Sequence, residues 1–213
     1  MRNWLRALRG SQEPRAVDST IGALFDRVGS DKGRWYGRLY DVLLEPLRNS
    51  VQCMIEIGIG TMLPTAPSSM VNWAGENYRP GASLRVWRDY FPCAQIHGID
   101  PAPDTVVVGE PRITTHQFDS RDWTRAAALF ASLQLVPDLV IDDGLHTAEA
   151  QIATLRNFLP HVRPGGVYIV EDVELGDVKP VSAAIEQIRP GSIYVPDMRP
   201  EPWIAIAIRV PSI

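Results

Sequence analysis

The sequence contains little lysine, little cysteine and no long apolar run, and each shortage argues against a class of protein. Only Lys32 and Lys179 are lysines among 21 basic residues, and the net charge of −4 comes with no basic stripe, so a nucleic-acid-binding protein is not expected. No stretch approaches the roughly 18 consecutive apolar residues of a membrane helix. The arginine-rich segment 1–9 lacks the apolar core of a signal peptide and is predicted to be a short amphipathic helix. We therefore expect a cytoplasmic protein without a membrane span.

Length and composition indicate one globular domain. The 213 residues, 45% of them hydrophobic and 22% charged, suffice for a single α/β domain with a complete core. Of the two cysteines, Cys53 lies at the start of a predicted strand and Cys93 lies just before one. We expect both to be small core residues in a reducing compartment.

Apolar runs and helical patterns alternate along the chain. Strands are predicted at 52–57, 95–100, 112–118, 138–142, 167–172, 192–195 and 203–210, and helices at 83–91 (with Ser83 as N-cap), 121–133, 147–159 and 181–188. This alternation indicates a mostly parallel sheet with helices on both faces. The short loop between the last two strands predicts that they are antiparallel. The expected α/β fold is Rossmann-like, and its seven strands with a closing hairpin match a class I methyltransferase sheet better than a dehydrogenase sheet.

Two segments fall outside this alternation. Residues 1–50 are predicted to form a helical region packed on the core, and residues 51–213 the cofactor-binding core itself. Residues 61–82 form a loop rich in proline, serine, glycine and asparagine, which is typical of a lid over a binding site. A disordered surface insertion is the alternative, although Met62, Met70, Trp73 and Tyr78 are apolar for one. Trp73 and Tyr78 either stack on a substrate or pack the loop against the domain.

The first predicted strand ends in a glycine-containing loop, Glu56-Ile57-Gly58-Ile59-Gly60. In open parallel sheets ligands bind beyond the carboxyl ends of the strands, and glycine allows the backbone to approach them closely. The third glycine of the dinucleotide fingerprint would stand at Leu63, so a nucleoside-type cofactor is favoured over NAD. Glu56 lies inside the apolar run, and a buried carboxylate needs a partner.

Polar residues at the ends of the next two strands extend this cofactor prediction. Asp100 ends the second strand, where a carboxylate accepts hydrogen bonds from ribose hydroxyls; alternatively it is a turn residue before Pro101. Phe118, Asp119 and Ser120 end the third strand, where an adenine would stack. The alternative for Asp119 is that it caps the following helix.

Acids gather at the ends of the fourth and fifth strands. The fourth ends in Ile141-Asp142-Asp143-Gly144-Leu145-His146 and the fifth in Glu171-Asp172. Because neighbouring strands lie about 4.8 Å apart, these acids can converge, and their repulsion calls for a cation. Oxygen ligands suit Mg²⁺, and we predict a site at Asp143, Glu171 and Asp172. Helix caps and turn residues without a metal are the alternative.

His146 is the predicted general base. It follows Asp143 by three residues, and its reference pKa near 6.5 would leave it neutral at pH 7. The alternative is that it caps the next helix. The other histidines, His97, His116 and His161, have no acidic company and are expected to be structural or solvated.

Taken together, these segments resemble the metal-dependent sugar O-methyltransferases of natural-product pathways, such as those acting on macrolide and aminocoumarin sugars. The resemblance covers roughly residues 28–172, although Leu145 stands where the family often has serine. The matching segments are Ser30-Asp31-Lys32-Gly33 with Tyr36 and Tyr40, Ile55–Gly60, Gly81–Arg85, Asp89–Pro92, Gly98–Asp100, Ile141–His146 and Gly165–Asp172.

The resemblance implies S-adenosylmethionine (SAM) and Mg²⁺ as cofactors, a small-molecule or oligosaccharide acceptor, and a homodimer. His146 and Asp143 would be catalytic, with Asp143, Glu171 and Asp172 holding the metal. The cofactor would contact Glu56, Gly58, Gly60, Ser83, Asp100, Phe118, Asp119, Ser120 and Asp142, and the acceptor would contact Tyr36, Tyr40, Trp73 and Tyr78. Small size and arginine-rich composition are also similar to the mycobacterial-type methyltransferases that act on 3-O-methylmannose oligosaccharides. A catechol-type O-methyltransferase, an NAD-dependent oxidoreductase and a catalytically silent binding protein are the alternatives.

Overall fold

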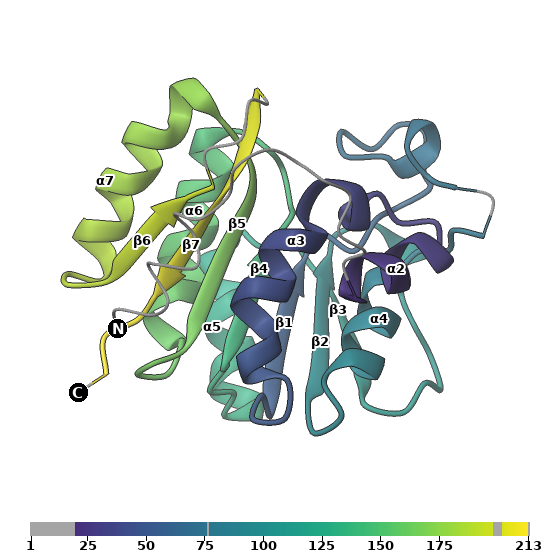
Figure 1. The fold of residues 1–213 in the computed structure, drawn as a ribbon, viewed down its shortest axis with the longest axis horizontal. Coiled ribbons are helices and arrows are strands. Elements are labelled where there is room, and N and C mark those ends of the chain that lie inside the picture. Colours follow the sequence, from purple (N-terminus) through teal and green to yellow (C-terminus); the bar gives the residue numbers. More distant parts are fainter. Residues whose placement is uncertain (1–19, 76, 198–201, 213) are drawn as a thin grey trace.

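A seven-stranded sheet lies between two layers of helices in the computed structural model, which describes residues 20–75, 77–197 and 202–212 (Figure 1). The strand order is β3-β2-β1-β4-β5-β7-β6. The first five strands run parallel, and β7 is antiparallel to both of its neighbours. The strands are β1 Cys53–Ile57, β2 Gln95–Asp100, β3 Ile113–Gln117, β4 Leu139–Asp142, β5 Val167–Glu174, β6 Ile193–Pro196 and β7 Trp203–Arg209. The predicted α/β sheet with its closing antiparallel hairpin is confirmed.

Alternation of side chains along the buried strands divides the core into two halves. In β1, Met54 belongs to one apolar cluster and Ile55 to the other. The first cluster includes residues of α2 (Thr20–Arg27), α3 (Lys32–Leu44) and α4 (Ala82–Tyr90). The second includes residues of α5 (Trp123–Leu133), α6 (Ala148–Phe158) and α7 (Val178–Ile188). Short 3-10 helices lie at Glu45–Leu47, Met70–Asn72, Pro103–Thr105, Leu159–His161 and Leu175–Asp177.

Several boundaries differ from the sequence prediction because of local capping. Gly81 is the N-cap of α4, so the prediction that Ser83 caps this helix is wrong. The Asp122 side chain accepts a hydrogen bond from the backbone N–H of Arg125, and α5 therefore begins after Asp122 and not at residue 121. β5 continues two residues beyond Asp172, because its pairing with β7 resumes after a bulge between Val170 and Val173.

The prediction for the N-terminal segment is not tested by the structure, and one of the two cysteine predictions is wrong. Segment 1–9 lies outside the described residues. Cys53 is half-buried, whereas Cys93 is exposed, so the expectation that Cys93 is a core residue is wrong. The reason is its position in the turn between α4 and β2, one residue before the buried Ala94. Within the described ranges, no helix is both long and apolar enough to cross a membrane.

A histidine pair joins β2 and β3. The rings of His97 and His116 stack with centroids 5.4 Å apart, and His97 Nδ1 lies 3.1 Å from His116 Nε2. Burial and the neighbouring His116 lower the pKa of His97 to about 4. The unfolded chain takes up this proton near pH 6.5, so between pH 6.5 and pH 4 the unfolded state binds more protons than the folded state.

The stability of the protein is therefore expected to fall as the pH drops from about 6.5 to 4, with His97 contributing roughly 1–2 kcal/mol to the loss. In the variant His97→Gln this part of the pH dependence should be absent. Urea unfolding at pH 7.5 and pH 5 measures the difference for both proteins. An equal loss of unfolding free energy in wild type and variant would contradict the assignment.

Candidate functional site

Two glycines shape the loop that follows β1. Gly58 and Gly60 both have a φ of +76°, which L side chains rarely adopt. A Cβ atom on Gly58 would lie 1.9 Å from the backbone oxygen of Asp143, because the loops after β1 and β4 touch at this point. At Gly60 the carbonyl oxygen accepts a hydrogen bond of 2.9 Å from the hydroxyl of Tyr78, which ties the 61–82 loop to the glycine loop.

Asp100 orders the same loop from the end of β2. Its carboxylate accepts hydrogen bonds from the backbone N–H groups of Ile59, at 3.0 Å, and Ala102, at 2.9 Å. It lies on the wall of a cavity of about 160 Å³. Of the nine residues predicted to bind the cofactor, the wall of this cavity includes Gly58, Asp100, Asp119 and Ser120. Asp100 therefore both holds the turn and lines the cavity.

The other five predicted cofactor residues do not line this cavity; they are Glu56, Gly60, Ser83, Phe118 and Asp142. Ser83, in the first turn of α4, donates a 2.6 Å hydrogen bond to Oε2 of the fully buried Glu56, which identifies the partner that Glu56 was expected to need. Asp142 accepts a hydrogen bond of 3.1 Å from the hydroxyl of Tyr168, and burial raises its pKa to about 7. Phe118 packs in the second apolar cluster, and Gly60 lies beside Tyr78.

The residues that end β3 are held by local partners. Asp119 forms a 2.6 Å ion pair with Arg121, and it is Asp122 that caps α5, so the capping alternative for Asp119 is wrong. The hydroxyl of Ser120 lies 3.0 Å from the hydroxyl of Thr154 on α6. Asp119 and Ser120 thus reach the cavity from a loop that is fixed on both sides.

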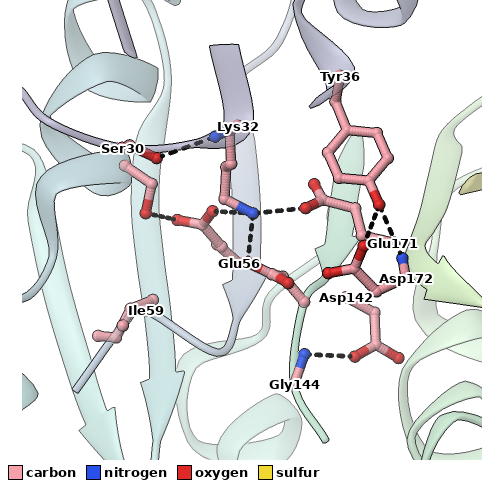
Figure 2. A network of polar contacts seen from close by, with 12 residues as sticks. Ser30, Lys32, Tyr36, Glu56, Ile59, Asp142, Gly144, Glu171 and Asp172 are labelled. Carbon is pink, nitrogen blue, oxygen red and sulfur yellow. Dashed lines mark hydrogen bonds and ion pairs between the residues drawn. The ribbon is translucent and has the colours of Figure 1, made fainter. Parts of the chain in front are cut away.

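Lys32, the first residue of α3, lies in the middle of the acids (Figure 2). Its Nζ is 2.6 Å from Oδ2 of Asp143 and 2.6 Å from Oε2 of Glu171. Burial alone would lower the pKa of Lys32, but the charges of the acids outweigh it and raise that pKa well above the usual range. For Glu171 burial has the opposite effect: it raises the pKa to about 7, although the charge of Lys32 acts to lower it.

The bulge in β5 sets the direction of Asp172. Its φ of +49° breaks the alternation of the strand, so that both Glu171 and Asp172 reach the site. Tyr36 on α3 donates its hydroxyl to Oδ1 of Asp172 and accepts a 3.0 Å hydrogen bond from the Asp172 N–H. Gln151 on α6 donates its amide to the backbone oxygens of Glu171, at 3.0 Å, and Asp172, at 3.2 Å, which holds the bulge from the other side.

His146 connects two of the acids. Its Nε2 lies 3.1 Å from Oδ1 of Asp143, and its Nδ1 lies 3.6 Å from Oδ2 of Asp172. Burial would lower its pKa, but the hydrogen bond and charge of Asp143 and the charge of Asp172 raise it to about 9. With only these carboxylates around it, His146 is therefore protonated at pH 7. The sequence prediction of a neutral imidazole is not met in this arrangement. Thr147 caps α6, so the capping alternative for His146 is also wrong.

These side chains have the composition and spacing of a metal centre. Ligand atoms of Asp143, His146 and Asp172 all lie within 4.8 Å of one another. The second oxygen of Glu171, Oε1, is buried without a hydrogen-bond partner among the described residues. An unpartnered buried carboxylate oxygen is costly unless something binds it. Of the three predicted metal ligands, Asp143 and Asp172 thus belong to a group that could hold a cation, with His146 as its third member, whereas Glu171 is not in that group.

A second and larger cavity, of about 420 Å³, opens on this cluster. Its wall combines the three acids and His146 with the aromatic residues Trp35, Tyr36, Trp73 and Trp203. Pro67 and Ser68, from the 61–82 loop, line both cavities, so the loop lies over the two together.

Two of the four predicted acceptor contacts lie elsewhere. Tyr40 is completely buried against Phe25 and Trp87, so direct contact with an acceptor is ruled out in this structure and that prediction is corrected. Tyr78 hydrogen-bonds to Gly60 and is not among the residues that line the larger cavity, which favours the packing alternative for this residue.

Sequence reasoning missed Lys32, Gln151, Trp35 and Trp203 as residues of the site. For Lys32 a signal existed, since it is one of only two lysines and stands in the Ser30–Gly33 segment. For Gln151 and the two tryptophans no signal existed, because each reaches the site only through the packing of α6, α3 or β7.

No family model matches the chain, but comparison with curated proteins finds relatives that are O-methyltransferases. The mycinamicin VI 2''-O-methyltransferase of Micromonospora griseorubida is 34% identical over 142 residues, which are 65% of this chain and 31% of the relative. The 8-demethyl-8-alpha-L-rhamnosyl tetracenomycin-C 2'-O-methyltransferase of Streptomyces olivaceus is 33% identical over 158 residues, which are 72% of this chain and 38% of the relative. The chain thus spans only 31% to 38% of the length of these curated relatives.

A solved structure of the same kind matches almost the whole chain. The MycE methyltransferase from the mycinamycin biosynthetic pathway, in complex with Mg and SAH, has a TM-score of 0.70 and 26% sequence identity, over 95% of this chain and 56% of that chain. A further structure of MycE also contains mycinamycin VI and matches with a TM-score of 0.69. The chain therefore has the class I methyltransferase fold and is a relative of the macrolide and polyketide sugar O-methyltransferases.

Proposed function

We propose that this chain is a SAM-dependent, Mg²⁺-dependent O-methyltransferase that acts on a sugar hydroxyl. The observation that carries the proposal is the convergence of Asp143, Glu171, Asp172 and His146 on the wall of one aromatic-lined cavity, beside a smaller cavity at the glycine loop. The similarity to O-methyltransferases that act on mycinamicin VI and on a rhamnosyl tetracenomycin, and the Mg and SAH in the MycE structure, support the same interpretation.

The two cavities divide the proposed task between them. The smaller one, at Gly58, Asp100, Asp119 and Ser120, is the proposed site for SAM, with the Asp100 carboxylate beside the ribose. The larger one is proposed for the acceptor, whose hydroxyl would face His146. Bound SAM would supply an electrophilic methyl group, and Mg²⁺ on Asp143, Glu171 and Asp172 would lower the pKa of the hydroxyl beside it.

The side chains of the protein would then position the reactants and move one proton. His146 accepts the hydroxyl proton as general base, and its hydrogen bond to Asp143 fixes the direction of the ring. The carboxylates that raise the pKa of His146 belong to Asp143 and Asp172, which are proposed metal ligands. A divalent cation bound to them would oppose this rise in the pKa of His146. Lys32 and Tyr36 hold the remaining oxygens in place.

We also propose that residues 61–82 act as a lid on the 51–213 core and exclude water, with residues 1–50 as a helical region packed on it. The lid is anchored at its start, where Asp104 accepts hydrogen bonds from the hydroxyl of Thr61, at 2.6 Å, and the N–H of Met62, at 2.8 Å. Its middle portion is tied by the N–H of Gly75 to the carbonyl of Gly29. A homodimer is expected from the family resemblance, and sedimentation velocity measures it.

A methylated mannoside is the narrower acceptor that we propose, on the resemblance in size and composition. A panel of mannosides, rhamnosides and catechols, assayed with methyl-labelled SAM, tests the acceptor class. We expect label on the glycosides, with the methylated mannosides labelled fastest. Label on the catechols alone would contradict the sugar acceptor and favour the catechol-type alternative, whereas binding of NAD without SAM would contradict methyl transfer itself.

The tryptophans of the larger cavity are expected to bind the acceptor. Trp73 is 63% exposed and lines the same cavity as Trp35 of α3 and Trp203 of β7, and aromatic faces bind the apolar faces of sugars. Trp73→Ala is expected to raise KM for the acceptor by about tenfold, which corresponds to about 1.4 kcal/mol, with little change in the Kd of S-adenosylhomocysteine. Steady-state kinetics measures the KM for the acceptor, and calorimetry measures the Kd of S-adenosylhomocysteine.

Trp123→Ala is the matched control for this variant. Trp123 is 69% exposed on α5 and lines neither cavity, so its removal should leave the acceptor KM unchanged. An unchanged KM in Trp73→Ala as well would sink the assignment of Trp73 to the acceptor site.

A further inference from the structure

The ammonium of Lys32 binds one carboxylate oxygen of Asp143 and one of Glu171, which are both proposed metal ligands. Figure 2 shows the contact between Lys32 and Glu171. The ammonium contacts Oδ2 of Asp143 and Oε2 of Glu171, both at 2.6 Å, and lies 3.6 Å from Oε1 of Glu56. Its side chain is 6% exposed, so no water shell competes for these contacts. Lys32 is thus enclosed by carboxylates from the ends of β1, β4 and β5.

The second oxygen of each ligand is not held by Lys32. Oε1 of Glu171 is buried without a hydrogen-bond partner among the residues that the structure describes. Oδ1 of Asp143 faces Nε2 of His146 at 3.1 Å. Each of these two carboxylates therefore has one oxygen fixed by an ammonium and one oxygen that Lys32 leaves to another partner.

This division matters for the choice of metal. Ca²⁺ takes about six to eight oxygen ligands and commonly uses both oxygens of a carboxylate. Mg²⁺ requires a near-octahedral shell, keeps several waters and takes one oxygen from each of its few carboxylates. A carboxylate with one oxygen tied to an ammonium offers only the other oxygen, which suits Mg²⁺ and deprives Ca²⁺ of ligands.

We propose that Lys32 is a metal-selectivity residue: by holding Asp143 Oδ2 and Glu171 Oε2, it restricts both ligands to one oxygen each and favours Mg²⁺ over Ca²⁺. Lys32 acts through the ligands and is a positioning residue. The inference rests on the proposed function, since it requires a divalent cation at these acids.

The experiment measures binding and not turnover. Isothermal titration with MgCl₂ and with CaCl₂ gives two Kd values for the wild type, for Lys32→Met and for Lys179→Met. Lys179 is the other lysine of the chain, exposed on α7, and its replacement is the matched control. We expect wild type and control to bind Mg²⁺ more tightly than Ca²⁺. In Lys32→Met the ratio of the two Kd values should shift toward Ca²⁺ by about tenfold, a change of the size that loss of a group orienting metal ligands has on metal affinity.

An unchanged ratio in Lys32→Met, including an equal gain in affinity for both metals, would overturn the inference, because Lys32 would then only compete with any cation. Lys32→Gln, which keeps a hydrogen-bond donor, is the second variant if Lys32→Met does not fold. A wild type that binds Ca²⁺ more tightly than Mg²⁺ overturns the inference without any variant. A wild type that binds neither metal overturns the proposed metal-dependent function itself, and this outcome is seen before any variant is measured.

Discussion

The variant His146→Ala is expected to lower kcat for methyl transfer by about a thousandfold, since a general base contributes on the order of 10²–10⁴. His146 lines the acceptor cavity, where its Nε2 lies 3.1 Å from Oδ1 of Asp143 and its Nδ1 lies 3.6 Å from Oδ2 of Asp172. The His146 side chain lines the acceptor cavity and not the proposed SAM cavity. The Kd of S-adenosylhomocysteine should therefore change by less than about twofold, which is below about 0.5 kcal/mol. Single-turnover rates together with calorimetry separate the two effects.

His161→Ala is the control for this loss. His161 stacks on Phe130 with ring centroids 3.8 Å apart and lines neither cavity, so its removal should leave kcat unchanged. If His146→Ala kept wild-type turnover, another group would have to be the base and the assignment of His146 would be wrong.

Gly58→Ala is expected to disrupt both cavities at once. The new Cβ would lie 1.9 Å from the Asp143 oxygen and 2.9 Å from the Cα of Gly144, and these are backbone atoms that cannot rotate away. Left-handed strain and overpacking together should reduce the free energy of unfolding by roughly 2–5 kcal/mol. The shift of Asp143 should also weaken binding of both Mg²⁺ and S-adenosylhomocysteine. Urea unfolding and calorimetry measure these effects.

Gly109→Ala isolates the steric part. Gly109 has the same φ of +76°, but an added Cβ there meets no atom within 4 Å. Its replacement should cost only about 1–2 kcal/mol from the backbone conformation. Equal losses in the two variants would mean that the contact between the β1 and β4 loops is not the constraint described above.

Much of the fold follows from the order of apolar segments. Six of the seven predicted strands lie within one residue of the observed bounds at each end, because buried strands are short apolar runs bounded by turn residues. β5 is again the informative case, since its end at Asp172 was predicted from the Glu171-Asp172 pair. The strand continues because β7 pairs with it on both sides of the bulge, and this contact is invisible in the sequence of β5 alone.

The acids of the site could be brought together from sequence for a topological reason. Parallel strands carry their carboxyl ends to the same edge of the sheet, so Asp143, after β4, and Glu171, in the neighbouring strand β5, were predicted to lie near one another. Lys32 could not be placed, since it lies 111 residues from Asp143 and 139 from Glu171 and reaches them through the packing of α3. The raised pKa of His146 was also out of reach, because it depends on the distances to Asp143 and Asp172.

Some residues of the recognised motifs support the loops of the site through buried contacts. Glu56 and Ser83 bond to each other beneath the glycine loop, and Tyr40 packs in the aromatic core around Trp87. A motif residue in a sequence marks a place where the structure is constrained, but burial decides whether the constraint concerns a ligand or the support beneath it.

The central claim is that Asp143, Glu171, Asp172 and His146 form a metal-dependent centre for methyl transfer. The most direct test is the rate of methyl transfer from labelled SAM to a glycoside acceptor, measured with Mg²⁺, after chelation by EDTA, and after Mg²⁺ is restored. Chelation is expected to abolish transfer, and restored Mg²⁺ is expected to recover it. Transfer that continues at the same rate after chelation would contradict the metal centre.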